Sequence, residues 1–229
     1  MTHFCFLRNA LSSSDPMPGV NAFDKNVDRY EQWFVDNPLA YVSELHALRE
    51  LLPTSGIGIE IGVGTGRFAA PLEIKKGVEP SRSMAEIARK RGIEVIHGVA
   101  EHLPFMDGEF DCALMVTTVC FLDDMDMAFQ EVRRVLKPGG LFVIGFVDRE
   151  SPLGTAYQDR KDKSAFYRDA TFYSAEDIVS HLQKAGFGEF AFRQTLFRPL
   201  AELSGVEPVK EGHGEGSFVV VRGEKKLTE

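Results

Sequence analysis

A glycine-rich segment limits the possible folds of this chain more than any other part of the sequence. An apolar run at residues 58–61 is followed by Gly62, Gly64 and Gly66. This pattern predicts a buried strand that enters a tight turn. Glycine permits positive φ angles and lets a ligand approach the backbone. Apolar residues from Phe68 onward predict a helix, so free N–H groups are expected to face a nucleotide-type ligand. The alternative is a strand-to-helix connection that binds nothing.

The glycine spacing alone leaves more than one nucleotide class open. The dinucleotide fingerprint GxGxxG requires a small residue at position 67, where this chain has Arg67. A register two residues later, with Gly64, Gly66 and Ala69, fits GxGxxA but places Gly62 inside the strand. An NAD(P)-dependent oxidoreductase is therefore one alternative. A protein that binds its cofactor without transferase activity is another.

The glycine segment and four later motifs carry a family resemblance. Glu60 before the glycines gives ExGxGxG, which resembles motif I of the class I S-adenosylmethionine-dependent methyltransferases. The other matches follow in order at residues 77–81, 100–105, 110–114 and 136–140. The likeness covers roughly residues 27–222 and is nearest to the small-molecule enzymes related to ubiquinone and menaquinone C-methyltransferases (methyltransferase type 11).

The resemblance implies a fold. It is an α/β Rossmann-like three-layer sandwich with a mostly parallel seven-stranded sheet, an antiparallel last strand and an N-terminal helical lid. Alternating strands and helices independently favour a parallel sheet that is covered on both faces. We expect residues 1–20 to form a poorly ordered arm and residues 21–229 to form one methyltransferase domain. Residues 21–52 should supply the N-terminal helices, and residues 148–170 a variable substrate segment.

The resemblance also implies the cofactor, S-adenosylmethionine, with S-adenosylhomocysteine as the product. Glu60 and Gly62 are expected near its methionine part. Glu79 follows Gly62 by 17 residues, close to the spacing at which such folds place a ribose-binding acid at the end of the second strand. The complete expected cofactor-binding set is Glu60, Gly62, Gly64, Gly66, Glu79, Pro80, Met84, Ala100, Glu101 and Thr117.

The adenine loop departs from the pattern of the family. Val99 occupies the position where relatives often have an aspartate, so adenine recognition is expected from backbone groups at Ala100 and from Glu101. Thr117 is expected beside the reacting centre. No catalytic residue can be assigned, because an activated methyl group needs mainly positioning and exclusion of water. If a proton must be removed, the candidates are Asp148, Tyr157, His181 and a bound water.

Two groups of aromatic and charged residues could form a substrate pocket. Tyr30, Trp33 and Phe34 either wall such a pocket or pack in the core of an amphipathic helix. The substrate segment contributes side chains that could bind an anionic or aromatic acceptor, or else are solvated. These are Tyr157, Arg160, Phe166, Tyr167 and Arg168.

Composition excludes several other functions. The net charge of −8 argues against nucleic-acid or anionic-membrane binding as the main activity, because both need a cationic surface. The three cysteines have no metal-ligand spacing and form no disulfide framework, so we expect no metal and a cytoplasmic location. No segment reaches the roughly 20 apolar residues of a membrane span. We expect the methyl acceptor to be a small molecule, but the sequence does not identify it. The sequence does not predict the oligomeric state either.

Overall fold

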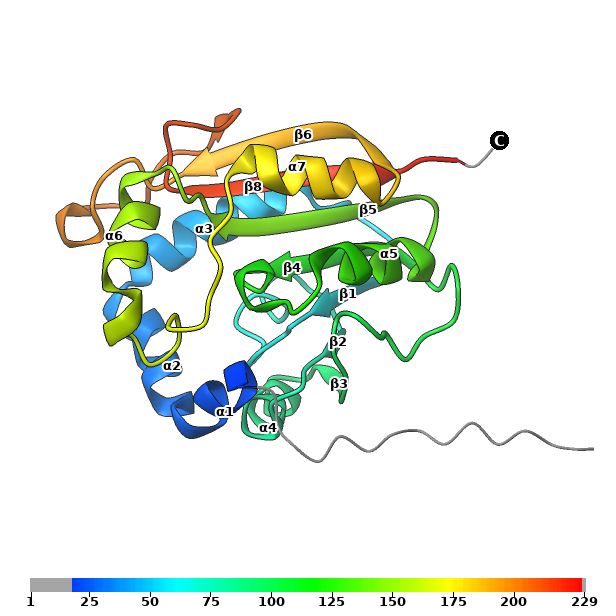
Figure 1. Ribbon diagram of the computed structural model, residues 1–229, viewed down its shortest axis with the longest axis horizontal. Helices are drawn as coiled ribbons and strands as arrows, with labels where there is room; N and C mark the ends of the chain where they lie inside the picture. Colours follow the sequence, from blue (N-terminus) through cyan, green and yellow to red (C-terminus); the bar gives the residue numbers. More distant parts are fainter. Residues whose placement is uncertain (1–17, 228–229) are drawn as a thin grey trace, which may run out of the picture.

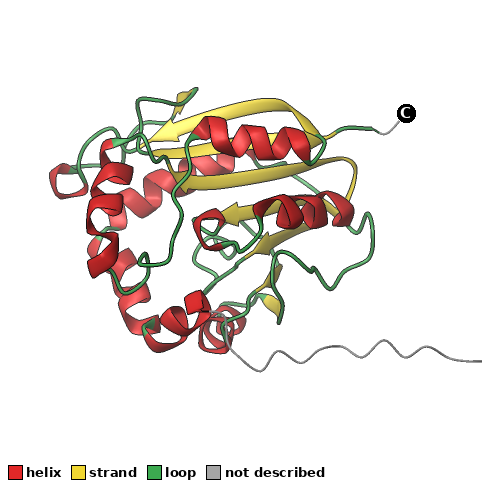
Figure 2. Cartoon of the chain, viewed as in Figure 1, coloured by secondary structure: helices red, strands yellow, loops and turns green. Residues whose placement is uncertain are grey.

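The computed structural model describes residues 18–227, and one mixed sheet forms its centre (Figures 1 and 2). The described residues contain eight strands: β1 (Gly58–Ile61), β2 (Lys76–Val78), β3 (Glu94–Ile96), β4 (Phe110–Val116), β5 (Leu136–Val147), β6 (Phe187–Thr195), β7 (Lys210–Glu211) and β8 (Phe218–Lys225). Their order in the sheet is β3-β2-β1-β4-β5-β8-β6-β7. The longer helices are α1 (Pro18–Lys25), α2 (Val27–Asp36), α3 (Pro38–Leu51), α4 (Arg82–Lys90), α5 (Met125–Val135), α6 (Pro152–Arg160) and α7 (Ala175–Lys184).

The strand directions confirm the expected fold class. Strands β1 to β5 pair in parallel, and β8 inserts antiparallel between β5 and β6. The sheet has eight strands instead of the expected seven, because Lys210 and Glu211 pair with Gln194 and Arg193 at the end of β6. A two-residue strand is too short to produce a detectable alternation pattern, so this part of the sequence looked like an uninterrupted loop.

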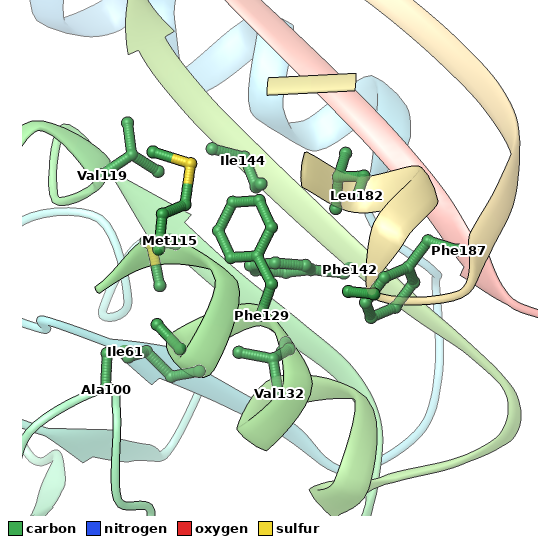
Figure 3. Packing of buried hydrophobic residues seen from close by; sticks show 14 of the residues in the cluster. Ile61, Ala100, Met115, Val119, Phe129, Val132, Phe142, Ile144, Leu182 and Phe187 are labelled. Carbon is green, nitrogen blue, oxygen red and sulfur yellow. The ribbon is translucent and has the colours of Figure 1, made fainter. Parts of the chain in front are cut away.

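Alternating residues of the central strands pack on opposite faces of the sheet. On one face, Met115 of β4 and Phe142 and Ile144 of β5 pack against helices α5 and α7 (Figure 3). Their neighbours in sequence, such as Leu114 and Val143, pack against α3 and the glycine loop on the other face. This period of two, apolar on both sides, is what a central strand covered by helices requires.

Three helices form the N-terminal region: α2 and α3 coincide with the two helical patterns of residues 27–52, and α1 precedes them. Helix α1 begins at Pro18, inside the segment expected to be a disordered arm, while residues 1–17 lie outside the described residues. Pro38 opens α3 at its first turn, where its missing N–H costs nothing. Asp24 of α1 accepts hydrogen bonds from the Ser81 hydroxyl and the Ser83 N–H, which fix α1 on α4.

The helix expected after the glycines is absent from the described structure. Residues 67–73 form consecutive turns instead. Pro71 has no N–H to donate, and Glu73 closes the segment with a positive φ of 62°, so the turns do not extend into a helix. Within residues 18–227, no helix is long and apolar enough to cross a membrane.

Candidate active site

The glycine loop after β1 is held in place by two neighbouring segments, the end of β2 and the turn at Thr118. The N–H groups of Gly62 and Val63 both donate to the Val78 carbonyl, which ties the loop to β2. Gly62 has a φ of 70°, and a Cβ there would lie 2.5 Å from the side chain of Thr118. Gly64 has a φ of 54° and lies below the Tyr30 hydroxyl. Both positions therefore need glycine for conformation and for space.

Glu79 connects the loop to the start of α4. Its Oε2 accepts a hydrogen bond from the Gly64 N–H, and its Oε1 accepts one from the Ser81 N–H, each at 2.8 Å. The side chain is buried, and this burial raises the pKa of Glu79 to about 7, against the opposing effect of the two hydrogen bonds. A carboxylate oxygen has two lone pairs, so each oxygen of Glu79 can accept one more hydrogen bond from a ligand.

Glu60 lies under the loop and does not reach the cavity surface. Its Oε2 is a buried oxygen without a hydrogen-bond partner in the described part of the chain. Burial raises the pKa of Glu60 well above its usual value, and the neighbouring Glu79 raises it further. A buried carboxyl with one unpartnered oxygen beneath a ligand loop fits a cofactor that carries positive charge.

A cavity of about 640 Å³ opens above the glycine loop. This volume falls within the roughly 300–1,000 Å³ of small-molecule sites. Of the residues expected to hold the cofactor, the following line it: Gly62, Gly64, Glu79, Pro80, Met84, Ala100, Glu101 and Thr117. Glu60 and Gly66 do not. Gly66 packs instead on α4, where a Cβ would lie 3.4 Å from Ala88 and 3.3 Å from Ile93.

The loops after β3 and β4 complete the cofactor half of the cavity. Glu101 accepts hydrogen bonds from the N–H groups of Asp123 and Asp124, so it fixes the segment that leads into α5. Thr117 has a φ of 50°, which is strained for a β-branched residue, and its N–H donates to the Gly145 carbonyl. Such strain is concentrated at ligand sites. Val99 also lines the cavity.

Aromatic side chains form the other half of the cavity. Tyr30, Trp33 and Phe34 of α2 line the cavity, as the pocket interpretation expected. Phe34 also packs in the core, so the alternative of core packing holds for this residue as well. From the substrate segment, Tyr157, Arg160, Phe166 and Tyr167 line the cavity and Arg168 does not. Helix α2 is anchored to the glycine loop by Glu31, which pairs with Arg67 and Arg91.

The three side chains considered as possible bases lie in different places. Asp148 is engaged in holding backbone, since its oxygens accept the N–H groups of Glu150 and Ala175. His181 of α7 pairs with Asp126 of α5, and neither residue lines the cavity. Tyr157 lines the cavity, but burial raises its pKa to about 12. Among residues 18–227, no group of three or more His, Cys, Asp or Glu side chains could hold a metal ion.

Sequence reasoning missed Glu44, a buried carboxyl that lines the aromatic half of the cavity. Its signal was present in the sequence. Glu44 interrupts the apolar stripe on α3 that Ala40, Ala47, Leu48 and Leu51 form at its i−4, i+3, i+4 and i+7 positions. Thr118, which packs against Gly62 and lines the cavity, is not among the residues expected from the sequence.

Comparison with known proteins gives consistent matches. The family model described as "Methyltransferase domain" matches residues 59–144. A protein from Methanocaldococcus jannaschii is 47% identical over 206 residues, which cover 90% of this chain and all of the relative. A Thermotoga maritima crystal structure, described as a SAM-dependent methyltransferase and possible histamine N-methyltransferase, is 57% identical with a TM-score of 0.88; the match covers 90% of this chain and 99% of that chain.

A more distant structural neighbour shares the fold and contains the product of the cofactor. The phosphoethanolamine N-methyltransferase 2 of Haemonchus contortus, in complex with S-adenosylhomocysteine, is 16% identical with a TM-score of 0.66. The match covers 92% of this chain and 61% of that chain.

Proposed function

The chain belongs to the class I S-adenosylmethionine-dependent methyltransferases, and from this premise we propose that it methylates a small molecule held in the aromatic half of its cavity. The observation that carries the proposal is the continuity of one cavity. The same space is lined by the glycine loop and Glu79 at one end and by Trp33 and Tyr157 at the other. A cofactor at the first end would leave the second end for an acceptor.

The residues at the loop end suit the parts of S-adenosylmethionine. We assign the ribose to Glu79, whose oxygens can each accept another hydrogen bond, and the adenine to the Met84 and Ala100 region. Glu60 would act from beneath the loop, where a cationic cofactor favours the ionised form of its carboxyl. Bound there, the cofactor supplies a methyl group on a positively charged sulfur, which is already activated toward a nucleophile.

The protein's contribution to in-line displacement is orientation and exclusion of water. The ring of Phe23 in α1 packs edge-on against Phe121 at 5.0 Å and stacks on Phe166 at 5.1 Å. Tyr30 packs edge-on against Phe166 at 6.5 Å. These contacts join the N-terminal helices to the substrate segment and line the cavity with apolar surface. An acceptor held there would meet the cofactor away from bulk water.

The oxidoreductase alternative has less support. Tyr157 and Lys161 do have the Tyr-x-x-x-Lys spacing of a proton-transfer pair, which sequence reasoning overlooked. The Lys161 ammonium, however, donates to the Ala170 carbonyl, and Lys161 does not line the cavity. A titration with NAD and NADP beside S-adenosylhomocysteine tests this alternative directly, and we expect heat from S-adenosylhomocysteine alone.

The test of a small-molecule acceptor is a fractionation experiment. The protein is incubated with methyl-labelled S-adenosylmethionine and a cell extract, and the products are separated by ultrafiltration. We expect protein-dependent label in the small-molecule filtrate. Label confined to retained protein or nucleic acid would contradict the proposal, and no transfer to any fraction despite tight cofactor binding would indicate a binding protein. Amines should be included in a first screen, because the Thermotoga protein is described as a possible histamine N-methyltransferase. The cytoplasmic location stays a prediction.

A further inference from the structure

Glu44 is a buried acid that the fold leaves without an internal partner. Its side chain is 4% exposed and lines the cavity, and within residues 18–227 it forms no hydrogen bond or ion pair. Its neighbour Ser43 has a structural role, since its hydroxyl donates to the Leu39 carbonyl and accepts the Glu207 N–H. Burying an unpaired carboxyl is costly, so an acid kept at this place calls for a ligand.

The surroundings of Glu44 favour a cation over an anion. The rings of Tyr157 and Tyr167 stack at 5.1 Å, and those of Trp33 and Phe34 meet edge-on at 5.1 Å. All four rings line the same cavity as Glu44. Aromatic faces carry partial negative charge, so they attract an ammonium group and repel an anion.

The basic residues that line the cavity are exposed. They are Arg29, Arg160 and Lys163, and Arg29 lies over the ring of Phe166 at 6.0 Å. The other charged residues on the second half of α3, namely His46, Arg49 and Glu50, are exposed. Exposed charges act through water and salt and have less influence on a buried ligand than a buried acid has. An anionic acceptor, which the sequence left open, would therefore be repelled by Glu44, and the exposed basic residues would offset little of this repulsion.

We propose that Glu44, with the rings of Trp33 and Tyr157, forms a subsite for the ammonium group of an acceptor that has an apolar or aromatic body. The inference rests on the proposed function and names the substrate class for the same cavity. Glu44 acts as a residue that determines specificity: its carboxylate accepts hydrogen bonds from the ammonium group, and the rings enclose the carbon atoms beside it.

The proton balance of binding provides a signature. Burial raises the pKa of Glu44 to about 8, so near pH 7 the empty site holds a proton that an ammonium group displaces. The titratable groups on which Glu44 acts electrostatically are Tyr30, Tyr41, Tyr157 and Tyr167, and burial raises the pKa of each, so they stay neutral in this range. Glu79, at the cofactor end, has a pKa raised to about 7, so its protonation state must be kept the same in every titration.

The experiment is a calorimetric titration of the protein saturated with S-adenosylhomocysteine. The probes are matched pairs of amines and alcohols with bodies of increasing size: butylamine and butanol, benzylamine and benzyl alcohol, 2-phenylethylamine and 2-phenylethanol, with 3-phenylpropionate as the anion. Each pair is measured near pH 7 in two buffers that differ in ionisation enthalpy. We expect at least one amine to bind about 10- to 150-fold more tightly than its alcohol, with release of a proton.

Two variants separate the role of Glu44 from a general effect. In Glu44→Gln the advantage of the amine and the proton release should disappear, while the affinity for the alcohol stays within about twofold. Glu50→Gln, at the exposed end of the same helix, should behave as wild type. If the amines bind no better than the alcohols, or no probe binds, the inference is wrong. If the advantage survives in Glu44→Gln, another group binds the ammonium and the inference is also wrong.

The two proposals can fail independently. S-adenosylhomocysteine is titrated first, and its failure to bind would count against the proposed function. Normal binding of S-adenosylhomocysteine together with indistinguishable amines and alcohols would overturn the amine subsite alone. The comparison of amine with alcohol on the wild-type protein stands even if Glu44→Gln does not fold.

Discussion

Replacing Glu79 by glutamine should weaken binding of S-adenosylhomocysteine and leave the fold in place. In the wild-type protein both carboxylate oxygens already accept backbone N–H groups, from Gly64 and Ser81, at 2.8 Å. The glutamine oxygen can keep one of these bonds, and its NH₂ group then faces the other N–H. The variant therefore loses one acceptor toward the backbone and one toward the ligand.

The size of the effect follows from the charge on the lost acceptor. A hydrogen bond to a charged group contributes about 1.5–3 kcal/mol, so the dissociation constant of S-adenosylhomocysteine should rise about 10- to 150-fold. The unpaired backbone N–H should lower the free energy of unfolding by about 1–3 kcal/mol, which a urea titration measures separately. Glu86→Gln, an exposed acid on α4, is the matched control and should change neither quantity.

The pH dependence supplies a second test of the same role. Burial raises the pKa of Glu79 to about 7 in the empty protein, while ribose hydroxyl donors favour its ionised form. The pKa of Glu79 in the complex is therefore lower, and S-adenosylhomocysteine should bind more weakly as pH falls below about 7. The Glu79→Gln protein should lack this dependence. Unchanged affinity in a folded Glu79→Gln variant, with the wild-type pH profile retained, would refute the ribose assignment.

Three further outcomes are expected. Gly62→Ala places a Cβ 2.5 Å from Thr118 at a φ of 70°, so it should cost about 1–3 kcal/mol of unfolding free energy and abolish binding of S-adenosylhomocysteine; wild-type values in both assays would contradict the close packing of the loop. Burial raises the pKa of Glu31, but hydrogen bonds from two arginines and a threonine lower it to about 2, so the stability that it contributes is present above pH 4.5 and lost toward pH 2. Urea titrations should show a difference in unfolding free energy between wild type and Glu31→Gln that is smaller at about pH 3 than at about pH 6. An equal difference at both pH values would exclude the ion pairs as its cause. Burial raises the thiol pKa to about 11 in Cys112 and about 12 in Cys120, so mass spectrometry should find neither alkylated by iodoacetamide near pH 7 in the folded protein, and rapid labelling of either would show an accessible thiolate.

Sequence patterns located the elements whose side chains repeat regularly. Residues 110–116 are apolar on both faces, the pattern of a central strand, and they form β4 (Phe110–Val116). Ser174 and Asp177 have the spacing of a capping box, which is formed at the start of α7. These features depend on contacts within a few residues, which a sequence shows directly.

The parts that sequence reasoning missed depend on local residues that oppose the apolar spacing or on contacts between distant segments. The turns after the glycine loop replaced a helix because Pro71 and the left-handed Glu73 outweigh the apolar spacing. Asp148 and His181 were plausible bases by residue type, but one holds backbone N–H groups and the other pairs with Asp126. Only the packing of α3 against the sheet shows that Glu44 faces a cavity and not solvent.

The arrangement of charge within the cavity gives a direct means of separating acceptor classes. Glu44 and Glu79 lie buried in its wall, with pKa values raised by burial to about 8 and about 7, while Arg160 and Lys163 are exposed at its mouth. With S-adenosylhomocysteine at Glu79, a cationic acceptor that contacts Glu44 ionises it and releases a proton, so its binding weakens as pH falls below about 8. An anionic ligand favours the protonated acids, and its binding would strengthen over the same range. The direction of this pH dependence, measured with S-adenosylhomocysteine already bound, therefore decides between an amine and an acid as the acceptor.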